Sequence, residues 1–178
     1  MTKNILKLSA FLLLAAFFTS CSGEDTTIQN DAPHSSARSS YWNGVIGVDG
    51  GGNRYQITAN PALLIADFEQ QLAAEGDTVQ LQSLAIVKKK ATNDSTDEAY
   101  MLIATDNATT SIGVMLERTA EATFKLSLSS DAGTKSVSCR GCATGCNLEY
   151  LNMPGGKVPY CNVNGCGEFC TKREISMD

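Results

Sequence analysis

The first region with a clear hydrophobic pattern is predicted to be a β-hairpin. Apolar residues dominate 41–48, glycine and other turn-forming residues fill 49–53, and apolar residues alternate again over 54–58. Two short apolar stretches around a glycine-rich turn are typical of a hairpin. A glycine-rich loop can also bind a phosphate, but a P-loop needs a Gly-Lys-Ser or Gly-Lys-Thr and a helix. Neither follows here, so we interpret 49–53 as a turn.

The second pattern has the spacing of an amphipathic helix. Leu64, Phe68 and Leu72 recur at every fourth residue, which places them on one face of a helix. Asn60 followed by Pro61 favours a helix start, because Asn caps the free N–H groups and Pro fits the first turn. Gly76 favours the end of the helix. We therefore predict a helix of about four turns that packs its apolar face on a sheet.

Further along, stretches of apolar or alternating residues predict four more strands, at 78–87, 99–105, 111–116 and 123–128. Polar turns are predicted between them, at 91–98, 106–110 and 119–122. The short connections imply antiparallel pairing. The predicted fold class is α+β: an antiparallel sheet with one amphipathic helix packed on it over 41–136, followed by a small disulfide-rich C-terminal module over 137–178.

Charged residues gather beside one of these turns. Residues 88–90 are three lysines, and the predicted turn 91–98 that follows is rich in acids. We interpret the lysines as a solvated strand end that discourages edge pairing. Asp94, Asp97 and Glu98 could suggest a calcium site, but the spacing and glycine of an EF-hand loop are missing. A solvated acidic turn is the preferred interpretation.

The first twenty residues have the three parts of a secretory signal peptide. Lys3 and Lys7 supply the positive charge, residues 8–18 form an apolar run, and small residues follow directly before Cys21. A membrane-spanning helix needs about 20 apolar residues, so this run is too short to span. Residues 1–20 are therefore predicted to be a signal peptide that is removed on export.

Residues 18–21, Phe-Thr-Ser-Cys, resemble the lipobox of bacterial lipoproteins, which usually has Leu where this chain has Phe18. The resemblance implies cleavage before Cys21, a thioether lipid on its sulfur and acylation, such as palmitate, on its new amino group. Several acyl chains hold a protein on a membrane better than one. Ser22, where Asp would imply inner-membrane retention, points to the outer membrane. The acidic Gly23–Asp25 is similar to the surface-export tag of Bacteroidota lipoproteins. The alternative is an ordinary signal peptide.

Residues 21–40 are predicted to be a flexible tether, because they contain few large apolar residues. His34, the single histidine of the chain, lies in this segment and is expected to be solvated. One histidine is too few for most hydrolase triads and zinc enzymes. Removal of two lysines with the signal peptide changes the formal charge from −5 to −7. An acidic chain argues against nucleic acid as a partner.

Six of the seven cysteines cluster near the C-terminus. They are Cys139, Cys142, Cys146, Cys161, Cys166 and Cys170. In an exported chain, an even number of clustered cysteines indicates disulfides, and six cysteines allow 15 pairings that the sequence does not distinguish. Few apolar residues remain to build a core in this segment. We therefore predict three disulfides with unassigned pairing.

Metal and redox uses of the same cysteines are weaker alternatives. A zinc ribbon needs two Cys-x2-Cys knuckles, and only Cys139-x2-Cys142 is present. The spacing also differs from a bacterial ferredoxin. A redox-active Cys-x-x-Cys should open a helix, whereas here the pair follows a strand-like 135–138. No metal ligands and no cofactor are predicted.

The whole chain is similar to small exported lipoproteins of the Bacteroidota type with a C-terminal Cys-x2-Cys-x3-Cys tail. This resemblance implies no particular activity. We find no nucleophile–base pair and predict no catalytic residues and no enzyme. The leading hypothesis is an outer-membrane-anchored binding or structural protein of the cell envelope, with the membrane as partner and an unknown protein or small ligand. The alternatives are a redox or metal protein, or an inhibitor-like module, since the outline is loosely similar to cystatins.

Overall fold

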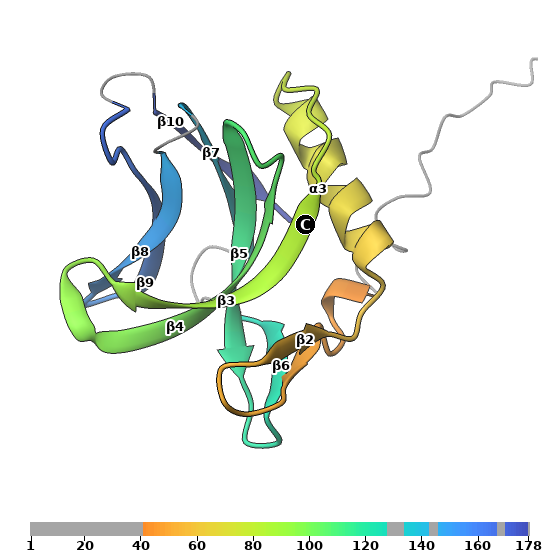
Figure 1. Cartoon of the computed structure of the whole chain (residues 1–178), viewed down its shortest axis with the longest axis vertical. Coiled ribbons are helices and arrows are strands. Elements are labelled where there is room, and N and C mark those ends of the chain that lie inside the picture. The colour runs from red at the N-terminus through yellow and green to blue at the C-terminus, as the bar shows by residue number, and fades with distance from the viewer. Residues whose placement is uncertain (1–40, 128–133, 143–145, 167–169, 178) are drawn as a thin grey trace, which may run out of the picture. The chain divides into compact units, whose positions relative to one another are not determined.

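The computed structural model describes residues 41–127, 134–142, 146–166 and 170–177 (Figure 1). They belong to the unit of the chain that spans Pro33–Asp178. The predicted signal peptide, Cys21, and the tether with His34 lie outside the described residues. Within the described ranges, no helix has both the length and the apolar character needed to cross a membrane.

One complete helix and ten strands form in the described part of the chain. The helix is α3 (Pro61–Ala74), and the strands are β1 (Gly47–Asp49), β2 (Tyr55–Ile57), β3 (Ser83–Ala91), β4 (Asp94–Thr105), β5 (Thr110–Arg118), β6 (Thr123–Leu126), β7 (Lys135–Arg140), β8 (Asn147–Met153), β9 (Gly156–Asn162) and β10 (Thr171–Ser176).

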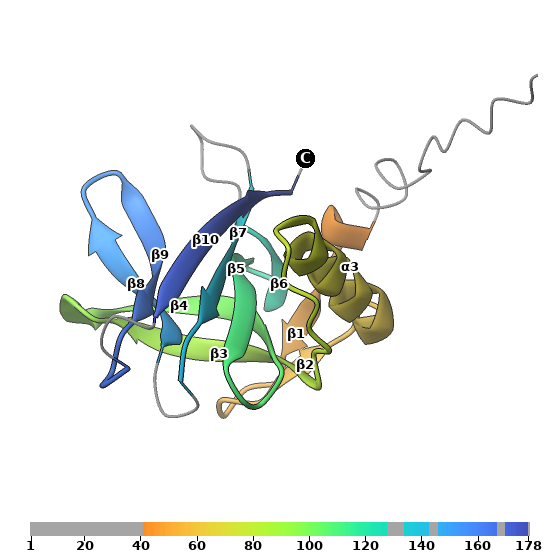
Figure 2. The same ribbon diagram turned by 90° about the horizontal axis from the view of Figure 1, so that it is seen from above.

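Eight strands form one antiparallel sheet in which β5 is the branching strand. The order β10-β7-β5-β6-β1-β2 runs along one path, while β4 pairs with the other side of β5 and β3 with β4. Thr110–Gly113 of β5 pairs with β7, and Leu116–Arg118 pairs with β6. Because β2 returns to lie beside β3, the sheet is barrel-like. The separate β8–β9 hairpin and α3 lie on opposite sides of it (Figure 2).

Helix α3 begins and ends as the sequence predicts. The Asn60 side chain accepts hydrogen bonds from the N–H groups of the first helical turn, and Pro61 occupies that turn. Gly76 takes a φ of 86° just after the helix, a value that glycine adopts without strain. Leu64, Phe68 and Leu72 are buried. The predicted hairpin forms as β1 and β2, but its first strand begins only at Gly47, because residues 41–42 are helical.

The face of the sheet that α3 covers contains the larger apolar core. Its largest fully buried side chains are those of Ile46, Leu64, Phe68, Leu72, Leu102, Ile112, Val114 and Phe124. A buried polar network crosses this core. Trp42 Nε1 and Gln71 Nε2 donate to Asp67 Oδ2 at 3.0 and 2.7 Å, and Ser136 Oγ donates to Gln71 Oε1. These bonds satisfy the polar groups that burial removes from water and connect the helix to β7.

The opposite face carries a second core under the β8–β9 hairpin. Leu148 and Tyr150 of β8 are buried there with Met101, Val137 and the cystines. Gly113 makes the close approach of β8 possible, because a Cβ at this position would lie 2.8 Å from Leu148 Cδ2 and 2.5 Å from the Leu102 carbonyl oxygen. The hairpin therefore packs directly on the sheet.

The predicted fold class is confirmed in part. The antiparallel sheet, the single helix packed on it and the C-terminal disulfides are present. The description as α+β fits only partly, because most of the described chain is strand and the sheet is barrel-like. The expected boundary between residues 136 and 137 falls inside β7, and β7 and β10 are both strands of the main sheet.

Two further strand boundaries were predicted wrongly. The strand expected over 78–87 begins only at Ser83, since Leu81 packs in the first core and its N–H donates to Glu69 Oε1 at 2.8 Å. The turn expected over 91–98 shrinks to two residues, because β4 begins at Asp94. Ion pairs explain why so acidic a segment forms a strand: Glu98 pairs with Lys88, and Asp97 pairs with Lys157.

Candidate functional site

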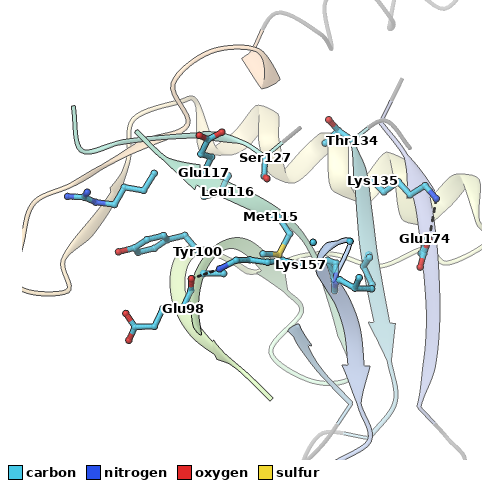
Figure 3. A pocket seen from close by; sticks show the side chains of 17 residues that line it. Glu98, Tyr100, Met115, Leu116, Glu117, Ser127, Thr134, Lys135, Lys157 and Glu174 are labelled. Atoms are coloured by element: carbon cyan, nitrogen blue, oxygen red, sulfur yellow. Dashed lines mark hydrogen bonds and ion pairs between the residues drawn. The ribbon is translucent and has the colours of Figure 1, made fainter. Parts of the chain in front are cut away.

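A groove with a volume of about 760 Å³ opens on the face of the sheet that carries the β8–β9 hairpin (Figure 3). Strands β4 and β5 contribute residues 98–100 and 115–118, and the hairpin contributes residues 155–159. Lys135 and Val137 come from β7, Thr134 directly precedes that strand, and Glu174 comes from β10. The groove is thus built by segments that are up to 76 residues apart in the chain, from residue 98 to residue 174.

The apolar part of the groove joins the second core to the surface. Ala99 and Val137 are buried, Met115 is half-buried, and Val158 is 42% exposed. Burial of apolar ligand surface against such side chains is favourable by about 25 cal/mol per Å². This part of the groove can therefore hold an apolar portion of a ligand.

Three disulfides fasten one wall of the groove. Cys139 of β7 joins Cys161 of β9, Cys142 joins Cys166, and Cys146 joins Cys170. The first, second and third cysteines of residues 139–146 thus pair with the first, second and third cysteines of residues 161–170. The structure brings the six cysteines into three pairs with Cα–Cα distances of 5.2 to 5.5 Å, inside the usual range for disulfides.

Lys157 fixes the hairpin turn against β4. Its Nζ donates to Asp97 Oδ1 at 3.0 Å and to the Glu98 carbonyl oxygen at 2.6 Å, and lies 5.3 Å from the centre of the Tyr150 ring. The Tyr150 hydroxyl donates to the Asp97 carbonyl oxygen at 2.9 Å. Burial, and then Asp97, raise the pKa of Tyr150, so its hydroxyl stays protonated. These contacts hold the groove wall without a ligand.

Charged side chains at the groove are mostly engaged with one another. Arg118 Nε donates to Asp49 Oδ2 at 2.7 Å, and Lys135 lies 3.4 Å from Glu174. Lys172, and then Lys135, hold the pKa of Glu174 below its ordinary value. The groove therefore combines an apolar floor with a rim of paired charges.

The residues that the sequence suggested for other sites are dispersed. Asp94 accepts from Thr96, Asp97 from Lys157, and Glu98 pairs with Lys88, so the three carboxylates serve different partners. Within the described ranges, no group of three or more His, Cys, Asp or Glu side chains is placed to hold a metal ion. Lys88 and Lys89, expected to be solvated, pair with Glu98 and Glu149.

Sequence reasoning missed the groove itself. Its polar residues include Glu117, Ser127 and Lys157, which come from three different segments and form no spaced motif. The glycines at 155 and 156 were the only local pattern in this region, and they indicate a turn.

Compared with protein-family models, curated proteins and solved structures, the chain gives no match in any of the three.

Proposed function

We propose that this chain is a lipid-anchored binding protein of the cell envelope that holds a small molecule in the groove beside the β8–β9 hairpin. The observation that carries the proposal is the groove. A volume of about 760 Å³ is in the range of small-molecule sites, which combine apolar walls with a few polar groups. The described residues that line it include no histidine and no cysteine, which supports binding rather than catalysis.

The construction of the groove also supports a binding role. Most of the described residues that line it belong to strands, and three cystines and the Lys157 contacts fasten the hairpin that forms one side. A site on rigid elements loses little conformational entropy when a ligand arrives. Such rigidity suits a protein that must hold a ligand outside the cell.

The anchoring part of the proposal depends on the N-terminal sequence. A lipid on Cys21 and a tether to residue 40 would place the binding domain near the membrane. A flexible chain of that length has a root-mean-square extension of roughly 25 Å. The domain would then reach molecules at the membrane surface.

A titration with 1-octanol tests the binding function. We expect saturable shifts of the Met115 and Val137 methyl NMR signals, because the apolar chain would lie against them. Val158→Arg, at the groove wall, should weaken this binding at least fivefold. Val163→Arg is the matched control, because Val163 is also exposed and lies outside the groove. Shifts that never saturate, or that are equal in both variants, would contradict the proposal.

Fractionation and intact mass test the anchor. Cys21→Ser should abolish the lipid-sized mass, whereas Ser22→Ala should leave the chain membrane-bound and carrying that mass. The same membrane-extracted protein, alkylated before and after reduction, tests the cysteines. Free thiols or a bound metal would favour the redox or metal alternative instead. A Cys21→Ser chain that still carries the lipid-sized mass would refute the anchor.

A further inference from the structure

The polar groups of the groove divide into engaged donors and open acceptors. The three cationic side chains that line it are all held by carboxylates: Arg118 by Asp49, Lys135 by Glu174, and Lys157 by Asp97. An anionic ligand would have to compete with these existing ion pairs. The groove is therefore poorly prepared for a negatively charged group.

The open acceptors lie toward one end of the groove, where Figure 3 shows Glu117 and Ser127 near each other. Glu117 is exposed, and its carboxylate has no hydrogen-bond or ion-pair partner among the described residues. Lys125 stands opposite Glu117 in the strand register but forms no ion pair with it. The hydroxyls of Ser127 and Thr134 also line the groove. These groups can accept hydrogen bonds from a ligand.

We propose that the ligand of the groove is a small amphipathic amine, an inference that rests on the proposed function. Its apolar part would lie on Met115, Val137 and Val158, and its ammonium group would pair with Glu117. An ammonium group brings a positive charge and three hydrogen-bond donors to the carboxylate of Glu117. The net charge of −5 also favours the approach of cations.

A peptide that adds as a strand is a poorer occupant, and β9 shows why. The Tyr150 carbonyl oxygen accepts a hydrogen bond from the Thr92 N–H, so it points away from β9. Tyr150 and Pro159 are therefore a pair without mutual hydrogen bonds, and the backbone groups of Pro159 point away from β8, toward the outer edge of the hairpin. Pro159 has no N–H to offer an incoming strand at this edge. A small molecule fits this edge better than a strand does.

Titrations of the oxidised protein with n-octylammonium, 1-octanol and octanoate test the inference. The two ions are kept below their micelle concentrations, and 1-octanol is kept below its solubility limit. We expect n-octylammonium to bind at least threefold more tightly than 1-octanol, and octanoate to bind most weakly. Glu117→Gln should weaken n-octylammonium binding by about threefold to fivefold, the range for an exposed ion pair, and leave 1-octanol binding unchanged. Glu121→Gln removes the same charge outside the groove and should have no effect.

The three probes and the two glutamate variants distinguish failure of the amine preference from failure of the binding function. Equal saturable binding of all three probes, or an equal loss in both glutamate variants, would overturn the amine preference while the groove remains a binding site. Tighter binding of octanoate would likewise refute it. If none of the probes binds saturably, the proposed binding function fails as well.

Discussion

The two faces of the sheet are covered by different physical means. The face under α3 is held by burial of large apolar side chains such as Phe68 and Phe124, together with the polar network around Asp67. The opposite face has fewer large apolar residues and is closed by three cystines and by the contacts of Lys157. Among the described residues, the groove opens on the face that the β8–β9 hairpin covers and not on the face that α3 covers.

The difference shows how a small domain can keep a hollow surface. A cover that depends on burial must fill its space, because each void loses packing energy. A hairpin held by disulfides can leave a groove beneath it. The disulfides stabilise the fold by lowering the entropy of the unfolded chain, and this contribution does not depend on whether the groove is filled. We therefore expect the two faces to respond differently to the same perturbation.

Reduction should have the largest effect and should act on one face. Each bridge closes a loop of 22 or 24 residues, and its loss costs about 3 kcal/mol of unfolding free energy. Hydrogen exchange with and without reductant should show the β8–β9 amides losing protection well before those of α3. Simultaneous loss in both elements would mean that the two covers are one cooperative unit.

A truncation in α3 should be nearly as costly on the other face. Leu64→Ala removes a side chain that is fully buried, and should lower the free energy of unfolding by about 2–5 kcal/mol. Leu63→Ala, one residue earlier and 48% exposed, should cost below about 1 kcal/mol. Denaturant titration of the oxidised proteins measures both. Equal losses would show that the helix does not pack as described.

A methyl group at Gly113 should separate the hairpin from the sheet. Because its Cβ would meet the Leu102 carbonyl oxygen and Leu148, Gly113→Ala should cost about 1–3 kcal/mol and weaken 1-octanol binding. Gly50→Ala is the control, since a Cβ there meets nothing closer than 3.4 Å and Gly50 lies outside the groove. A Gly113→Ala protein as stable as the control would argue against close packing of β8.

The smallest effect concerns the sheet that both faces share. Burial raises the pKa of Asp106, but hydrogen bonds from the Thr110, Ala108 and Thr109 N–H groups outweigh it and hold the pKa below its ordinary value. The ionised carboxylate therefore stabilises the β4–β5 turn above about pH 4 and stops doing so as the pH falls through the lower folded pKa.

Asp106→Asn should therefore lower the free energy of unfolding by about 1 kcal/mol at neutral pH. The difference from the unmodified chain should shrink as the pH falls from about 5 to about 2, because the carboxylate is then protonated. Denaturant titrations across this range measure it. A difference that stays constant with pH would show that the charge of Asp106 is not what stabilises the turn.

Local chemistry made part of the fold predictable. The signals for α3 all lie within or next to that one element. They are the Asn60 cap, Pro61 in the first turn, and apolar residues at every fourth position, so the sequence alone identifies the helix. Strand β4 was misjudged at its start because its acids are neutralised by Lys88 and by Lys157, which lies 60 residues from Asp97. Hydrophobic periodicity does not record pairing between distant charges.

The cysteines and the groove show the same limit. Their number and clustering predicted disulfides, but choosing among 15 pairings requires distances across β7 and β9 that only the folded chain has. Glu117, Lys157 and Glu174 come together because β5, the hairpin and β10 meet on one face. No spacing along the chain contains that information.

The order of the cystine pairs has a consequence for proteolysis. Every bridge joins a residue up to Cys146 with one from Cys161 onward, so all three span the β8–β9 hairpin and its exposed turn around residues 153–158. Exposed turns are preferred sites of nicking. A chain cut there remains one covalent molecule with three links between its fragments, and β10 is retained. Separation of the two fragments would require reduction of all three bridges.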